Sequence, residues 1–178
     1  KVLLAHDYRE KGNLSKAIEI LERLTDPNPE NREGRLIYPK NYYELAILYE
    51  SARGGLSREE IRHKMIKIVR TMKSSLNTGL AGTHYKDRIL GCQSAFYREK
   101  QTSGYLLDLG ILNRIILYVS ALMEAKSAMG VIVAAPTAGS CGGLPGTVLG
   151  AAEAMGSSEN DMAESMLAAG MIGVFISA

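Results

Sequence analysis

The sequence predicts an all-α protein, with a helical domain around a buried central helix, a glycine-rich site loop, and an N-terminal helical hairpin in front of that domain. Apolar residues make up 46% of the 178 positions and aromatic residues only 6%, with no tryptophan, a composition typical of close-packed helices. Apolar residues also recur at helical spacing along most of the chain. Residues 105–128 are apolar nearly all round, which indicates a helix buried on every side.

Composition also restricts the classes of function. The 21 Lys and Arg residues against 19 Asp and Glu give a net charge of +2, too small an excess to predict binding to nucleic acid or to a membrane surface. The two cysteines, Cys92 and Cys141, cannot form a disulfide framework and indicate a reducing compartment. The longest apolar stretches carry charged residues and predict no membrane span. No signal peptide opens the sequence, so we expect a cytoplasmic protein.

Residues 1–40 are predicted to form the helical hairpin, and residues 41–178 the main domain. Gly12 and Asn13 break the first part of the hairpin into two helices. The polar, turn-rich residues 26–40 are the predicted linker. The second helix has one apolar face, formed by Leu14, Ala17, Ile18, Leu21 and Leu24.

The hairpin also carries a possible interaction motif. The spacing of small and apolar residues between Leu4 and Pro29 is similar to a tetratricopeptide repeat, with a partial echo from Leu45 to Tyr49. Two interpretations stay open: an ordinary helical hairpin, or a peptide-binding helical array in a non-catalytic interaction module.

Two more helices are predicted before the first glycine-bearing turn. Residues 41–52 form one, which two glycines end. Ser57 and Glu60 form a capping box at the start of the next. The segment from Asn77 to His84 is predicted to be a turn that walls the site. His84 is a candidate general base because imidazole titrates near neutral pH, with a surface histidine as the alternative.

The central helix is predicted to lead into the functional site. It delivers Glu124 and Lys126 to the start of the stretch VIVAAPTAGSCGGLPG, which runs from Val131 to Gly146. The glycines of this stretch permit backbone angles that a Cβ forbids. Pro145 suits the first turn of a following helix.

We therefore expect free N–H groups ahead of a helix N-terminus, an arrangement that binds anions. Cys141 lies among these groups, and the helix dipole and amides are expected to lower the pKa of its thiol. A glycine-rich turn with a buried cysteine is the alternative. Cys92 has no CxxC partner and is predicted to lie in the core. A last helix is predicted from about Glu159.

Three motifs resemble a known family. The run APTAGSCGGLPG resembles the APTxGxxGxxPG signature of iron–sulfur-dependent L-serine dehydratases, in their alpha chain or alpha domain. The run MEAKSAMG at 123–130 resembles the family's NExNAAMG, and Gly79, Leu80 and Gly82 resemble its GLTGGD. The resemblance extends from about Ser57 to the end of the sequence.

The resemblance implies a lyase that converts L-serine, or a close β-substituted amino acid, to pyruvate and ammonia. It implies a [4Fe–4S] cluster with Cys141 as a ligand, no PLP, and His84, Glu124 and Lys126 as catalytic candidates. A beta chain or beta domain and a homo- or hetero-oligomer are also implied. The substrate carboxylate would be held by the backbone of Thr137, Ala138, Gly139, Ser140, Gly142 and Gly143.

The sequence departs from the family pattern at several positions. Met123 and Lys126 replace asparagines, and Thr83 and His84 replace Gly–Asp. These changes leave the exact substrate open, and a degenerate subunit stays an alternative. The family expects further cluster cysteines downstream, whereas these 178 residues hold two. We therefore expect this polypeptide alone to lack the cluster.

Overall fold

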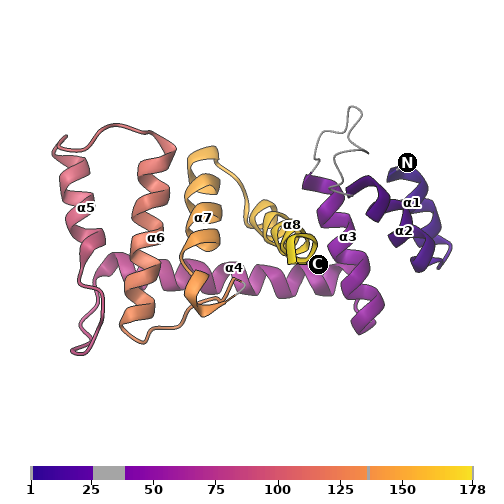
Figure 1. The fold of residues 1–178 in the computed structure, drawn as a ribbon, viewed down its shortest axis with the longest axis horizontal. Coiled ribbons are helices and arrows are strands. Elements are labelled where there is room, and N and C mark those ends of the chain that lie inside the picture. Colours follow the sequence, from indigo (N-terminus) through magenta and orange to yellow (C-terminus); the bar gives the residue numbers. More distant parts are fainter. Residues whose placement is uncertain (1, 26–38, 136, 178) are drawn as a thin grey trace. The chain divides into compact units, whose positions relative to one another are not determined.

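The structure is a computed structural model that describes residues 2–25, 39–135 and 137–177. In these ranges the chain forms eight α-helices, and the described part contains no strand (Figure 1). The predicted all-α class is confirmed. None of the helices, over the residues described, is long and apolar enough to cross a membrane.

The chain divides into two compact units, which we describe separately. The first comprises residues 1–65 and 163–178, and the second residues 66–162. Two long helices, α4 (Arg58–Ala81) and α8 (Glu159–Ser177), contribute to both units. The domain boundary that the sequence suggested at residue 40 stays a prediction.

The first unit begins with three helices. They are α1 (Val2–Glu10), α2 (Leu14–Thr25) and α3 (Pro39–Gly54). Gly12, with φ of +77°, lies between α1 and α2, which confirms the predicted break. The predicted linker lies outside the described residues up to position 38.

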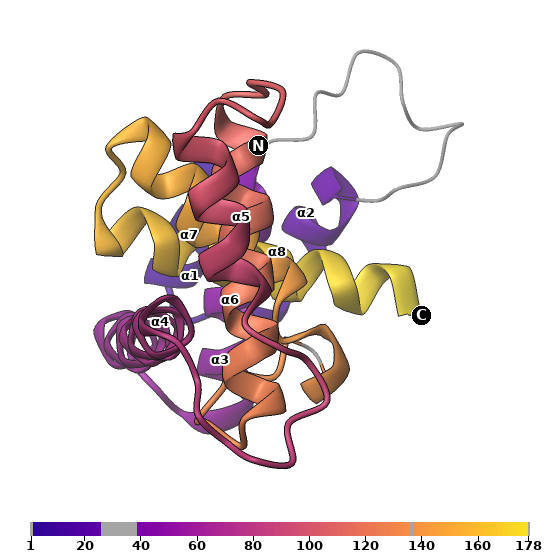
Figure 2. The same cartoon turned by 90° about the vertical axis from the view of Figure 1, so that its left-hand side faces the viewer.

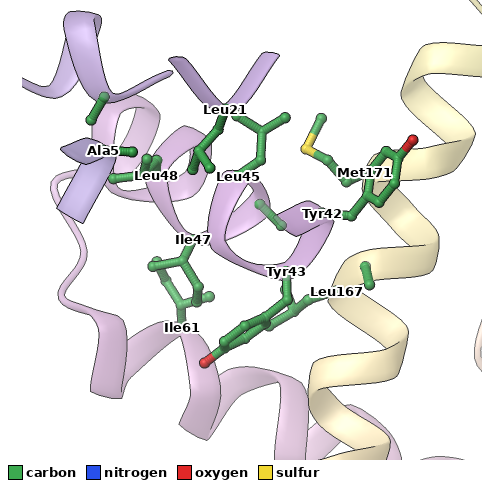
Figure 3. Packing of buried hydrophobic residues seen from close by; sticks show 13 residues of the cluster. Ala5, Leu21, Tyr42, Tyr43, Leu45, Ile47, Leu48, Ile61, Leu167 and Met171 are labelled. Atoms are coloured by element: carbon green, nitrogen blue, oxygen red, sulfur yellow. The ribbon is translucent and has the colours of Figure 1, made fainter. Parts of the chain in front are cut away.

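The core of the first unit joins these helices to the first turn of α4 and the middle of α8. Leu21, Leu45 and Leu48 are each at most 2% exposed, and Leu167 and Met171 of α8 pack into the same cluster (Figure 3). Burying a leucine side chain contributes roughly 2 kcal/mol relative to leaving it exposed. This apolar cluster is therefore what holds the first unit together.

The predicted capping box at the start of α4 is confirmed. The N–H of Ser57 donates to Oε2 of Glu60 (2.8 Å), and the N–H of Glu60 donates to Oγ of Ser57 (3.3 Å). The hydrogen bonds from the Ser57 backbone and then from its hydroxyl hold the pKa of Glu60 below its usual value.

The second unit contains the remaining helices. They are α5 (Gln93–Thr102), α6 (Ile111–Ser127), the short 3₁₀ helix η2 (Ala138–Ser140) and α7 (Gly143–Met155). Helix α6 packs against α5 on one side and α7 on the other (Figure 1). In Figure 2, α4 is seen end-on and α6 is seen along its length, so the two helices cross.

Glycines let the helices of the second unit approach closely. A Cβ at position 79 of α4 would lie 2.0 Å from the carbonyl oxygen of Ala121 in α6. Likewise, a Cβ at position 146 of α7 would lie 2.8 Å from the backbone nitrogen of Val119. Real Cβ atoms do not approach other atoms this closely, so backbone packs directly on backbone at both points.

The central helix differs from the one that the sequence predicts. Helix α6 begins at Ile111, because Gly110 adopts φ of +58° and its N–H is held by Asp108. The predicted burial on every side is wrong for its N-terminal half, where Leu112 is 51% exposed and Ile116 is 41% exposed. Burial is concentrated on one face and toward the C-terminal end.

Two other segments also differ. Helix α5 was not predicted, because only Ser94 of its residues is buried and its sequence carries no apolar stripe. The predicted turn from Asn77 to His84 is wrong in its first half, since α4 continues to Ala81. Gly82, with φ of +95°, starts the non-helical segment instead.

Candidate functional site

The site loop begins in an irregular segment that is tied to α4. Ser75, itself buried, donates from Oγ to the carbonyl oxygen of Val131. The segment continues without regular structure to Ala135, and Pro136 lies outside the described residues. The chain then turns through η2 into α7, whose first turn contains Pro145 as predicted.

A reciprocal pair of hydrogen bonds stabilises the turn. The N–H of Thr137 donates to Oγ of Ser140 (3.2 Å), and the N–H of Ser140 donates to the carbonyl oxygen of Thr137 (3.1 Å). Two of the N–H groups that were predicted to be free are therefore used within the turn. In the first turn of α7, Pro145 has no N–H and the N–H of Gly146 donates to the carbonyl oxygen of Gly142, so the N–H groups of Gly143 and Leu144 are the remaining donors.

The glycines of the loop serve packing rather than unusual backbone angles. Positive φ does not occur at Gly139, Gly142, Gly143 or Gly146, so these glycines do not use the backbone angles that they permit. Gly142 is buried against α6, where a Cβ would lie 2.8 Å from Cγ of Met123. Gly143 is exposed with open space where a Cβ would be, so a ligand can approach its backbone.

Cys141 lies at the junction of η2 and α7, and its side chain points into the protein. It is 1% exposed, and its Sγ lies 3.9 Å from Sδ of Met123 in α6. Burial raises the pKa of the Cys141 thiol, and the positive charge of Lys126 only partly opposes this shift. The predicted low pKa of Cys141 is therefore wrong, because burial outweighs the nearby charge.

The C-terminal turns of α6 organise the surroundings of Cys141. Lys126, which is half-buried, lies close enough to influence the Cys141 thiol. Glu124 is 1% exposed and accepts hydrogen bonds from the backbone N–H and the hydroxyl of Ser94, the latter at 2.9 Å. This carboxylate therefore anchors the N-terminus of α5, where a negative charge is favourable.

The segment between α4 and α5 folds onto the end of α6. Oγ of Ser127 accepts hydrogen bonds from the N–H groups of Ile89 and Leu90, both at 2.7 Å. His84 is exposed in this segment, and the described part of the structure records no interaction between it and Cys141. The role of residues 77–84 as a wall of the site stays a prediction, and the histidine of this segment is exposed.

Cys92 belongs to a small polar group in the same segment. Nη1 of Arg88 donates to the carbonyl oxygen of Thr83, to Oγ1 of Thr83 (3.2 Å) and to Sγ of Cys92 (3.0 Å). Cys92 is exposed, so its predicted place in the core is wrong. Hydrogen bonding to the Thr83 backbone and to the Arg88 guanidinium lowers the pKa of the Cys92 thiol.

The structure therefore brings together only part of the predicted site. Cys141, Lys126 and the exposed backbone of η2 and α7 are neighbours, whereas Glu124 is committed to α5 and His84 lies apart. Met123, Ser127 and Arg88 shape the surroundings and were not predicted. No three His, Cys, Asp or Glu residues within the described ranges lie close enough to hold a metal ion.

Comparison with known proteins gives one family and two relatives. The family model of the serine dehydratase alpha chain matches residues 15–178. The probable L-serine dehydratase alpha chain of Bacillus subtilis is 27% identical over 120 residues, which is 67% of this chain and 40% of the relative. The L-serine dehydratase alpha chain of Peptoniphilus asaccharolyticus is 32% identical over 114 residues, which is 62% of this chain and 38% of the relative.

The matched part of each relative is thus less than half of its length. No solved structure matches the chain.

Proposed function

Because the chain belongs to the serine dehydratase alpha chain family, we propose that it takes part in converting L-serine, or a close β-substituted amino acid, to pyruvate and ammonia. The observation that carries the proposal is the junction of η2 and α7. There Cys141 of the most specific family motif lies at the start of α7, and the charge of Lys126 in α6 acts on its thiol, which supports a site at this junction. The names of the two relatives support the same substrate.

The proposed reaction is a β-elimination. The α-proton of serine is removed by a base, the bond between Cβ and the hydroxyl oxygen breaks, and the hydroxyl leaves as water. The product, aminoacrylate, takes up a proton as it becomes an imine, and water hydrolyses the imine to pyruvate and ammonia. The protein must hold the carboxylate and assist the departure of a poor leaving group.

The family resemblance implies that a [4Fe–4S] cluster assists this departure. When bound, such a cluster supplies a Lewis acid that polarises a hydroxyl group. The described residues fit such a cluster only in part. Cys141 offers one sulfur ligand, and among the described residues no group of three His, Cys, Asp or Glu side chains could hold a metal ion. We propose Cys141 as one ligand and derive no step through the cluster.

The substrate carboxylate is proposed to lie against the backbone of the turn, from Thr137 to Gly143. Thr137 and Ser140 brace the turn through their own hydrogen bonds. The exposed N–H groups at the start of α7 then supply donors without a countercharge. Gly143 leaves room for a ligand, and Ala138 and Gly139 are exposed as well.

Three side chains have proposed roles around this carboxylate. Lys126 is proposed to bind or orient the substrate, since its charge already acts at Cys141. Glu124 is proposed to position α6 by anchoring α5, because both carboxylate oxygens are bonded to Ser94. His84 is proposed as the base, a role that requires the segment from Gly82 to Cys92 to bring it to the substrate.

We further propose that the chain acts with a beta chain in the cytoplasm. The alpha-chain names of the relatives support a partner of this kind. The small net charge supports neither nucleic acid nor a membrane surface as a partner.

The proposal is tested by measuring pyruvate release from L-serine. The whole gene product, combined with its beta chain and reconstituted anaerobically with iron and sulfide, should form pyruvate and ammonia in equal amounts. Replacing Lys126 with methionine should lower kcat/KM on the order of 100-fold, because a positioned charged group is lost. Lys64→Met, an exposed lysine on α4, is the matched control and should leave turnover unchanged. Turnover that survives iron chelation would contradict the proposal.

A further inference from the structure

A pocket beside α4 lies outside the residues assigned to the reaction. Its volume is about 480 Å³, and it lies entirely within the second unit. The lining residues are mostly polar and come almost entirely from one helix: Arg70, Thr71, Ser74, Ser75, Thr78 and Val131. Positions 71, 74, 75 and 78 share one face of α4, since residues three and four apart are neighbours on a helix.

Three of the four hydroxyl groups that line the pocket, those of Thr71, Ser75 and Thr78, are held as hydrogen-bond acceptors. Oγ1 of Thr71 donates to the carbonyl oxygen of Lys67 (3.0 Å), and Oγ1 of Thr78 donates to that of Ser74 (3.0 Å). Ser75 also donates to main-chain carbonyls. A hydroxyl has one proton and two lone pairs, so these three oxygens can accept from a ligand but have no proton left to donate.

One end of the pocket carries positive charge. Glu159 of α8 accepts from Nε of Arg70 and from Nζ of Lys73, both at 3.0 Å, so two cations face one carboxylate. The hydrogen bonds from Lys73 and then from Arg70 hold the pKa of Glu159 below its usual value, so the carboxylate stays charged. The Nη groups of Arg70 have no recorded partner in the described residues, and a guanidinium pairs well with a carboxylate.

From this arrangement we propose that the pocket binds a small α-amino acid in its zwitterionic form. The carboxylate pairs with the Nη groups of Arg70. The ammonium group donates to the oxygens of Thr71 and Ser75, which lie one helical turn apart on the same face of α4. The proposal does not rest on the dehydratase reaction, since it uses no residue assigned to that reaction.

The pocket's chemistry separates this ligand from simpler ones. An anion alone would satisfy Arg70 but leave the acceptor oxygens unmatched, and a cation alone would be repelled by Arg70 and Lys73. The zwitterion matches both ends. Acetate and ethylammonium carry the two charges separately, so each should bind at least about tenfold more weakly than L-alanine.

The test is an NMR titration of the 178-residue chain with L-alanine in metal-free buffer. L-Alanine has no β-leaving group, so failure of the dehydratase proposal would not affect the result. We expect saturable shifts of the amide signals between Arg70 and Thr78. Arg70→Gln should weaken binding at least about tenfold. Lys67→Gln, the same charge change on the same helix outside the pocket, should leave it unchanged.

Three results would overturn the proposal. The first is an absence of shifts between Arg70 and Thr78 at any L-alanine concentration. The second is an equal loss of binding in Arg70→Gln and Lys67→Gln, which would show an effect of general charge. The third is acetate binding as tightly as L-alanine, which would show a simple anion site.

Discussion

Replacing Gly79 with alanine should destabilise the second unit by about 3 kcal/mol or more. The new methyl group would lie 2.0 Å from the carbonyl oxygen of Ala121 and 2.5 Å from its carbon. Both atoms belong to the backbone of α6, so no side-chain rotation can relieve the clash and the two helices must move apart. The measurement is the midpoint denaturant concentration of unfolding, compared with that of the wild type. A lower midpoint reports lower stability when the slope of the unfolding free energy against denaturant concentration is the same for both proteins.

Gly143→Ala is the matched control for this prediction. Gly143 is in the same unit, in the first turn of α7, and a Cβ there would meet nothing within 4 Å. Alanine should therefore leave the stability unchanged or raise it slightly, since the unfolded chain loses freedom. If Gly79→Ala were as stable as Gly143→Ala, α4 and α6 would not pack as closely as described.

The thiol of Cys92 should react with iodoacetamide at least about 100-fold faster than the thiol of Cys141 in the native protein. Cys92 is exposed, and the Thr83 backbone and Arg88 lower the pKa of its thiol, so a larger fraction of it is the reactive thiolate than in an ordinary cysteine at the same pH. Cys141 is buried and the pKa of its thiol is raised, so its reaction requires local opening. Mass spectrometry of each cysteine over time gives the two rates.

The pH dependence of these rates gives a second check. As pH rises, the alkylation rate of Cys92 should level off at a lower pH than that of an ordinary thiol, because the pKa of Cys92 is lowered. Met123→Ala removes the thioether next to Cys141 and should speed alkylation of Cys141 while leaving Cys92 unchanged. Equal rates at the two cysteines in the native protein would contradict the described burial.

Most helices could be predicted from local sequence. The break at Gly12, the capping box of Ser57 and Glu60, and the start of α7 near Pro145 all follow from short-range chemistry. The start of α6 was predicted too early, at residue 105, because the apolar pattern continues upstream of the helix. In the structure, Gly110 has positive φ and α6 begins after it. Helix α5 could not be predicted because it has no apolar stripe and depends on Glu124, which is 30 positions from Ser94.

The site motif was found in the sequence, but its electrostatics were not. The position of Cys141 near a helix N-terminus suggested a lowered thiol pKa. The direction of the pKa shift is instead set by burial of the thiol, which lies against Met123 of α6. The lowered pKa of Cys92 depends in part on Arg88, which local pattern does not mark as a partner. Tertiary contacts decide such shifts, so spacing in the sequence cannot give them.

The most direct test of the central claim, that Cys141 is a ligand of the iron–sulfur cluster, is the iron content of cysteine variants. Wild type, Cys141→Ser and Cys92→Ser of the whole gene product would be reconstituted anaerobically, and iron and sulfide measured per polypeptide. We expect Cys141→Ser to lose the cluster iron and Cys92→Ser to keep it, since only Cys141 lies in the family motif at the junction of η2 and α7. Equal iron content in wild type and Cys141→Ser would contradict the claim.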